Sequence, residues 1–401
     1  MNNYYNILEI QNKSIKLLIC YLLNDQVKVV YSHEEKLKVP FIGADVLDVG
    51  SLSDDIAKIC KVDAKELDFK CDVKDVILVI PSFGLEVFSS SKTTNTISQI
   101  SKINKVDITN LFSMVRKEKV PNPNSEFINI IPNYFAIERD QTFLRAPIGY
   151  KSSFIAMSAN VYTLPKKAID DMKKAVTGAG IRINSVYASA VCAPEAIFKR
   201  HFKYKDYIYV DVSEKNTFMT LVGDNKVVAH TNFDKGLDTI VKGISDEFHL
   251  SYEESLKLAN VFGYDDSSYT YNPQIHEGVT KNQINNIIGN LFKDWSSYFY
   301  SNIRILLSNN ENYINRIPLI INGVGLSVNG FKNFISRNYP TNPIEYSEGD
   351  IIGAEDNKYI DLVGAVYLEK EIGMNFIDEP LETKIEIEVE DRKGEWLWIE
   401  I

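Results

Sequence analysis

Two stretches of sequence, YYNILEI at residues 4–10 and DYIYVDV at residues 206–212, open the same pattern twice. Each predicts a buried strand that leads into a polar turn, a second apolar strand, a two-residue reversal and a third strand. Glu9 and Asp211 are the acids near the ends of the two first strands, half a chain apart. An internal repeat of this length predicts two equivalent α/β halves that face each other.

The polar turns of the repeat are Gln11-Asn12-Lys13-Ser14 and Ser213-Glu214-Lys215-Asn216. The reversals are Asn24-Asp25 and Asp224-Asn225, which are residue types that favour tight hairpins. Glycine lets a backbone approach a phosphate closely, and both polar turns lack it. The side chains of Asn12, Lys13, Ser14, Lys215, Asn216 and Thr217 could instead bind phosphate, while Glu214 would oppose it.

Composition excludes several classes of function. With 44 basic and 54 acidic residues, the net charge of −10 disfavours a nucleic-acid partner. The four cysteines are scattered and predict reduced core residues, and the five histidines show no zinc motif. No apolar stretch reaches the roughly 18 residues of a membrane span, and Met1–Tyr5 does not begin a secretory signal. We therefore expect a cytoplasmic chain of two domains.

Periodicity and capping patterns predict further elements. Between the strand ending near Pro81 and the helix beginning near Lys166, an insertion has its own strand, helix and strand pattern. Ser251 to Glu254 fits a capping box for a helix that runs to Phe262. The remaining expected elements are strands at 73–81, 86–90, 126–137, 154–164, 184–188 and 318–323, and helices at 53–61, 107–117, 191–200, 280–309, 329–339 and 359–372.

A glycine signal follows the late strand of the second half. It is Asn322-Gly323-Val324-Gly325, followed by Asn329-Gly330-Phe331 at a helix start. A G-x-G alone is weak, and turn geometry is its commoner explanation.

At these residues, the chain resembles the bacterial cell-division family FtsA over about residues 4–370. The most specific segment runs from Phe127 to Pro165, where Ile131-Pro132, Phe135 and Pro147-Ile148-Gly149 match the family's pattern in its inserted subdomain. Further matches are Val210-Asp211-Val212, the helix ending at Phe262-Gly263, and the glycine segment at Gly323 and Gly325.

The resemblance implies the duplicated fold that actin shares with hexokinase and the heat-shock chaperones, with an FtsA-type inserted subdomain. The expected divisions are 1–83 with 161–203 for the first core subdomain, 84–160 for the insert, 204–262 with 317–375 for the second core subdomain, 263–316 for its outer subdomain, and 376–401 for a C-terminal tail.

The resemblance also implies an ATP site between the halves. The residues predicted at the nucleotide are Glu9, Asn12, Lys13, Ser14, Asp211, Lys215, Asn216, Thr217, Gly236, Lys257, Gly323 and Gly325, with Asp211 and Glu9 organising Mg²⁺. Of these, Asp211, Thr217, Gly236, Lys257, Gly323 and Gly325 keep the family's identities. Departures from the family put hydrolysis in doubt: Gln11 and Lys13 replace glycine and threonine, Ser213-Glu214-Lys215 replaces three glycines, and Phe218 replaces an aspartate. We expect at most a slow ATPase, with the lysines supplying some of the metal's charge.

Glu9 and Asp211 have a second interpretation. In this alternative, each is a strand-end acid paired with a nearby lysine, Lys13 or Lys215, in a cleft that no longer does metal chemistry. The residues alone favour neither interpretation over the other.

The resemblance implies three kinds of partner: the C-terminal peptide of FtsZ at the outer subdomain, other copies of the chain in a protofilament, and the membrane surface. Near the expected peptide region, Ile287, Leu291 and Trp295 have helical spacing typical of a core. In the tail, residues 384–390 and 395–401 favour a hairpin, although Trp396, Leu397, Trp398 and Ile399 could instead insert at a lipid interface.

The sequence thus predicts a division scaffold at the cytoplasmic face of the membrane. It would polymerise and link FtsZ to the membrane or to other division proteins. The alternative is an ATPase or kinase of the actin and hexokinase superfamily with an unusual phosphate site.

Overall fold

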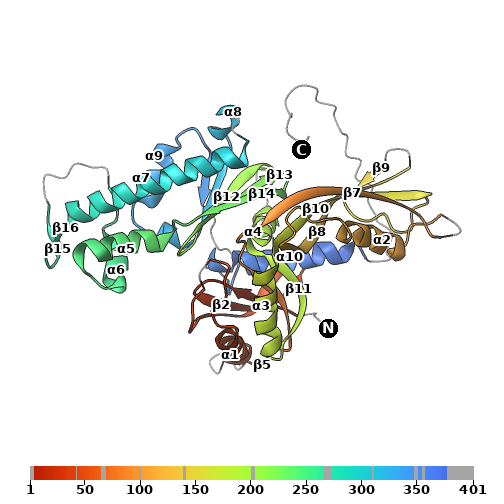
Figure 1. Cartoon of the computed structure of the whole chain (residues 1–401), viewed down its shortest axis with the longest axis horizontal. Helices are drawn as coiled ribbons and strands as arrows, with labels where there is room; N and C mark the ends of the chain where they lie inside the picture. The colour runs from red at the N-terminus through yellow and green to blue at the C-terminus, as the bar shows by residue number, and fades with distance from the viewer. Residues whose placement is uncertain are drawn as a thin grey trace. The chain divides into compact units, whose positions relative to one another are not determined.

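The structure of the chain is a computed structural model that describes residues 4–41, 43–64, 69–98, 101–138, 141–199, 204–265, 272–308, 311–346, 351–354 and 357–376 (Figure 1). The chain divides into two compact units. The first comprises Met1–Val87, Asn122–Asn129 and Tyr162–Glu369. The second comprises Phe88–Pro121, Ile130–Val161 and the chain from Lys370 onward. The predicted C-terminal hairpin or anchor lies outside the described residues.

The first sheet of the first unit has the strand order β11-β6-β1-β2-β3. Strands β1 (Tyr4–Ile10), β2 (Ser14–Leu23) and β3 (Gln26–Lys36) form an antiparallel meander, and β6 (Asp75–Ile80) and β11 (Arg182–Ala188) extend it in parallel. Asn24 and Asp25 both have positive φ, 50° and 63°, which is the backbone of a type I′ hairpin turn.

The second sheet repeats this topology in the order β14-β13-β12-β17-β18. Its meander is β12 (Tyr207–Val212), β13 (Thr217–Gly223) and β14 (Lys226–Phe233), and β17 (Leu319–Asn322) and β18 (Ile344–Tyr346) are the parallel strands. Asp224 and Asn225 have φ of 47° and 61°, so the second reversal has the same form as the first. The predicted duplication is confirmed.

Helices of the first unit lie beside both of its five-stranded sheets (Figure 1). The expected helices are present, with bounds shifted by a few residues, whereas α5 was not predicted because its N-cap, Gly236, has no side chain to signal a helix start. The helices of the first unit are α1 (Val49–Ile59), α3 (Lys166–Gly178), α4 (Ser189–Lys199), α5 (Leu237–Phe248), α6 (Tyr252–Val261), α7 (Lys281–Leu306), α8 (Glu311–Ile314), α9 (Phe331–Asn338) and most of α10 (Ile360–Met374). Two 3-10 turns, η2 (Val324–Ser327) and η3 (Asn357–Tyr359), also belong to this unit.

Two short hairpins complete the first unit. They pair β4 (Lys61–Ala64) with β5 (Phe69–Asp72) and β15 (Gln274–His276) with β16 (Val279–Thr280). Neither was predicted, because strands of two to four residues carry too little alternation to be read as a period.

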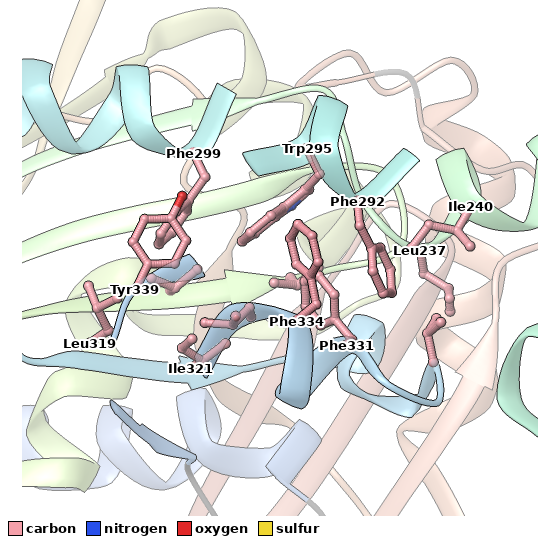
Figure 2. Packing of buried hydrophobic residues seen from close by; sticks show 14 of the residues in the cluster. Leu237, Ile240, Phe292, Trp295, Phe299, Leu319, Ile321, Phe331, Phe334 and Tyr339 are labelled. Carbon is pink, nitrogen blue, oxygen red and sulfur yellow. The ribbon is translucent and has the colours of Figure 1, made fainter. Parts of the chain in front are cut away.

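An aromatic core joins α7 and α9 to the second sheet. Figure 2 shows Phe292, Trp295 and Phe299 of α7 beside Phe331 and Phe334 of α9. Trp295 is buried as predicted, and its indole nitrogen donates to Thr217 Oγ1 at 2.9 Å. Ile287 and Leu291, also predicted to be core, are only partly buried against this cluster.

The second unit contains most of a four-stranded sheet in the order β7-β10-β8-β9, with helix α2. The bounds are β7 (Glu86–Asn95), α2 (Lys105–Arg116), β8 (Ser125–Ile137), β9 (Gln141–Phe143) and β10 (Phe154–Pro165). Asn104 rather than Asp107 is the N-cap of α2, and Asp107 reciprocates as the third helical residue. The end of α10 is fixed in this unit by Arg145, which contacts Glu371 at 3.1 Å.

Two glycines of α10 give a matched test of close packing. A Cβ on Gly364 would lie 1.8 Å from the carbonyl oxygen of Cys192 in α4, whereas a Cβ on Gly373 would meet nothing within 4 Å. We expect Gly364→Ala to lower the free energy of unfolding by about 2 kcal/mol or more, because the two helix backbones must separate. Gly373→Ala should stabilise the protein by about 0.5 kcal/mol. Urea unfolding measures both, and equal effects would contradict this account of the α4 and α10 contact.

Candidate functional site

Each of the two polar turns is closed by an equivalent backbone hydrogen bond. In the β1–β2 turn, the Gln11 N–H donates to the Ser14 carbonyl at 2.8 Å, and in the β12–β13 turn the Ser213 N–H donates to the Asn216 carbonyl at 2.9 Å. The turns are therefore equivalent in geometry as well as in sequence position.

Lys13 connects the first turn to the second half of the repeat. Its Nζ lies 2.8 Å from each carboxylate oxygen of Asp238, the second residue of α5, and 3.5 Å from Glu214 in the β12–β13 turn. The Tyr252 hydroxyl donates to the same Asp238 at 2.7 Å, and the ring of Tyr252 lies 5.4 Å from the ammonium. Lys13 was predicted as a phosphate ligand, and in the structure it binds carboxylates.

The other side chains predicted at the phosphates are also engaged by protein groups. Each one donates a hydrogen bond to an oxygen of the first unit, so a ligand would have to compete for it. The bonds run from Asn12 to the Gly43 carbonyl (3.2 Å), Ser14 to Glu34 (2.9 Å), Lys215 to the Phe41 carbonyl (3.1 Å), Asn216 to Asp234 (2.5 Å) and Thr217 to the Lys235 carbonyl (2.6 Å).

Glu9 is buried against Lys16 on the neighbouring strand. The two side chains are 1% and 3% exposed, and their charged atoms lie 3.0 Å apart. Lys16 also donates to the Lys358 carbonyl at 2.7 Å. Burial by itself would lower the pKa of Lys16, but the negative charge of neighbouring carboxylates, Glu9 foremost, outweighs it and raises that pKa, so the ammonium is retained.

The predicted lysine partners of the two acids were wrong. Glu9 pairs with Lys16 rather than Lys13, because residues on adjacent antiparallel strands face each other while a turn residue points away. Lys215 contacts a backbone carbonyl, and Asp211 instead accepts a hydrogen bond from Ser213 at 2.5 Å.

The pKa values of Asp211 and Asp361 are both raised above their usual range. Burial raises the pKa of Asp211, and the Ser213 bond only partly offsets this. The pKa of Asp361 lies well above its usual range, because burial and then the charges of Glu9 and Asp211 disfavour a further anion. A hydrogen bond joins Asp361 to Glu9. Nearby, Asn322 donates to the Tyr209 hydroxyl at 3.0 Å, while its buried Oδ1 has no partner among the described residues.

This donor set does not suit Mg²⁺. Glu9, one of the two predicted metal ligands, already faces the Lys16 ammonium, and a hard divalent cation requires ionised or carbonyl oxygens free to turn toward it. Among the described residues, no group of three or more His, Cys, Asp or Glu side chains is placed to hold a metal.

The glycines predicted at the nucleotide are required by packing. A Cβ on Gly236 would lie 2.4 Å from the Ser213 carbonyl oxygen, and one on Gly325 would lie 2.3 Å from Val212. Gly323 has φ of +104° and would clash with Asp211 at 2.4 Å. Lys257 lies exposed on α6. The last turn of α6 is bonded to the glycine segment through the Asn329 N–H and the Ala259 carbonyl, at 3.2 Å.

An aromatic contact lies where the family resemblance implies an acid. The ring of Phe218 meets Phe83 edge-on at 5.0 Å and stacks on His230 at 6.0 Å. His230 shares a hydrogen bond with Thr220 at 3.0 Å, and its Nε2 is sealed from solvent. Burial lowers the pKa of His230 to about 3.

Sequence reasoning missed Lys16, Asp238, Asp361 and His230. Of these, Lys16 carried a usable signal, because a charged residue inside the apolar run IKLLICYLL requires a buried partner. Asp238 and Asp361 follow no motif and are defined by contacts between distant segments.

Replacing Lys16 tests the buried pair. Lys16→Met should lower the free energy of unfolding by about 3–5 kcal/mol, because it leaves Glu9 buried without a counter-charge. The double variant Glu9→Gln with Lys16→Met should recover most of that loss. Urea titration followed by circular dichroism measures both, and a double variant no more stable than the single one would contradict the pairing.

His230 predicts a specific pH dependence. The folded state keeps the ring neutral down to a pKa of about 3, whereas the unfolded chain takes up a proton near pH 6.5. Stability contributed by the neutral ring is therefore present above pH 6.5 and falls as pH drops, by up to about 1.4 kcal/mol per pH unit. Because the buried acids titrate too, the quantity to measure is the difference in free energy of unfolding between wild type and His230→Phe. Between pH 7 and pH 4.5, this difference should change by up to the slope given above. A constant difference would contradict it.

Comparison with solved structures defines the class of protein. The PilM–PilN type IV pilus biogenesis complex matches with a TM-score of 0.60 and 13% identity over 95% of this chain and 100% of that chain. MreB5 of Spiroplasma citri bound to AMPPNP matches at 0.52 and 9% identity, over 92% and 98% of the two chains. EutJ from Carboxydothermus hydrogenoformans matches at 0.52 and 11% identity, over 92% and 90%. The fold is that of the actin-like ATPases.

Sequence comparison points to one group within this class. The chain is 26% identical to the cell division protein FtsA of Enterococcus faecalis over 189 residues, which is 46% of this chain and 42% of that protein. It is 21% identical to FtsA of Streptococcus pneumoniae over 257 residues, 64% of this chain and 55% of that protein. The matches span about half the length of these relatives. No protein-family model matches. The chain is thus an actin-like protein similar to FtsA.

Proposed function

We propose that the chain is an FtsA-type adaptor of bacterial cell division, which self-assembles and binds the C-terminal peptide of FtsZ. The similarity to FtsA carries this proposal, because the curated relatives reported above are division proteins of that name. The proposed self-assembly would use heterologous head-to-tail contacts between copies of this actin-like fold, which form open filaments where the rotation does not close.

Nucleotide chemistry has a minor part in this proposal. MreB5 of Spiroplasma citri was solved with AMPPNP and with ADP, and its fold is shared here. We infer that any ATP bound by this chain is held weakly and hydrolysed slowly or not at all. The paired state of Lys13 and Lys16 supports this, because each would have to leave a carboxylate to meet a phosphate or make room for Mg²⁺. Magnesium-dependent turnover that disappears in Asp211→Ala would favour the ATPase or kinase alternative.

The peptide is proposed to bind beside α7. A cavity of about 400 Å³ lies there, lined by Lys293, Ser296 and Tyr300 of α7 and by residues that follow α9, such as Tyr339 and Asn342. Lys293 is exposed and lies within the outer subdomain proposed for residues 263–316. An extended peptide with acidic groups could pair with Lys293 and bond to the hydroxyls and amides around it.

Attachment to a membrane is proposed through the C-terminal tail, which contains Trp396, Leu397, Trp398 and Ile399. None of the described helices is long and apolar enough to cross a membrane. The proposed location is therefore at the membrane surface where division takes place.

Peptide binding tests the proposal. A fluorescently labelled FtsZ C-terminal peptide should bind the full chain with a saturable rise in anisotropy, and Lys293→Glu should weaken binding about tenfold by opposing acidic groups. Lys242→Glu reverses an exposed charge on α5 outside the cavity and serves as the matched control. Absence of saturable binding by the intact protein would count against the adaptor role.

A further inference from the structure

The contact of Lys13 with Asp238, Glu214 and Tyr252, called here the Lys13 clasp, joins the two halves of the repeat. Lys13 lies in the β1–β2 turn, whereas Glu214, Asp238 and Tyr252 belong to the second half, more than 200 positions later. Both oxygens of Asp238 lie 2.8 Å from the ammonium, so the carboxylate is bound symmetrically. The clasp is therefore a direct ionic contact from the first turn to the start of α5 and, at 3.5 Å, to the second turn.

The clasp is partly sheltered from water, which strengthens it. The side chain of Asp238 is 9% exposed and that of Lys13 is 26% exposed. The Tyr252 hydroxyl donates a hydrogen bond to one oxygen of Asp238, and the ring of Tyr252 lies against the Lys13 ammonium. Ion pairs with low exposure and an added hydrogen bond are screened less by salt than surface pairs.

The N-terminus of α5 is closed by the β12–β13 turn. The first N–H groups of a helix are free to bind an anion unless something caps them. Here the Leu237 N–H donates to the Ser213 carbonyl at 3.1 Å, and the Asp238 N–H donates to the Glu214 carbonyl at 2.7 Å. Gly236 permits this contact, because a Cβ there would lie 2.4 Å from the Ser213 oxygen. The helix end that could hold a phosphate is therefore satisfied within the protein.

We propose that the Lys13 clasp takes the place of the nucleotide as the ionic contact that fixes the first polar turn against the second half of the actin-like unit. The protein then keeps one arrangement of its turns without ATP or Mg²⁺. An entering polyphosphate would have to displace Asp238 from Lys13 and would meet the negative charge of Glu214. This inference extends the proposed function but does not depend on it, since FtsZ-peptide binding could fail while the clasp remains.

Charge reversal tests the clasp in the full-length protein. Lys13→Glu and Asp238→Lys should each raise the equilibrium constant for unfolding about tenfold or more, and the double variant should recover at least half of that change on a logarithmic scale. Lys242→Glu reverses a solvent-exposed lysine on the same helix as Asp238 and should have little effect. Additive effects of the two reversals would overturn the proposal.

Nucleotide affinity gives a second measurement that does not require the reversed variants to fold. Asp238→Asn keeps the shape of the side chain but releases the charge of Lys13, so a fluorescent ATP analogue should bind at least about tenfold more tightly than to wild type, with or without Mg²⁺. ATP with Mg²⁺ at about 1 mM should raise the Tm of wild type by less than about 1 °C. Tight, magnesium-dependent binding by wild type that Asp238→Asn does not improve would overturn the clasp, whereas loss of FtsZ-peptide binding would overturn only the adaptor role.

Discussion

Glu9 and Lys16 lie on adjacent strands at the centre of the first sheet, and their opposite charges have to be balanced inside the protein. Taking both groups out of water is costly, and attraction between them repays that cost only when the remaining hydrogen-bonding positions are filled. The Lys358 carbonyl and the carboxyl group of Asp361 fill them. This requirement ties the N-terminal strands to α10 and the residues just before it, more than 300 positions away in the chain.

The duplicated architecture could be predicted because its signals are local. Each hairpin is encoded by alternating apolar runs and by a reversal whose two residues tolerate positive φ, such as Asn24 and Asp25. The capping box at Ser251 and Glu254 is equally local and was confirmed. The charge pairing could not be predicted in the same way. Lys13 was paired with the nearest acid in the sequence, but its partner Asp238 lies on α5, a helix whose start has no side-chain cap that the sequence could reveal.

The glycine-poor turns have a physical explanation in this pairing. Without glycine, the two turns carry side chains that would collide with a phosphate, but those side chains bind elsewhere in the first unit. Lys13 takes Asp238, and Lys215 takes the Phe41 carbonyl. The glycines that remain, at 236, 323 and 325, are those where a Cβ would strike the end of β12 or the turn after it. Close packing against these residues is therefore sufficient to require glycine at the three positions.

The raised pKa values of Asp211 and Asp361 bear on how the centre would respond to a metal ion. Glu9 already has the Lys16 ammonium as a counter-charge, accepts a hydrogen bond from the Gln11 side chain at 2.8 Å and shares another with Asp361. Mg²⁺ would need Asp361 or Asp211 to ionise, and burial opposes both because their pKa values are raised. Binding of Mg²⁺ would also place a divalent cation beside the Lys16 ammonium, which cannot move away without losing its contacts with Glu9 and the Lys358 carbonyl. The same buried charges that satisfy one another at the centre of the sheet thus oppose the binding of a divalent cation there.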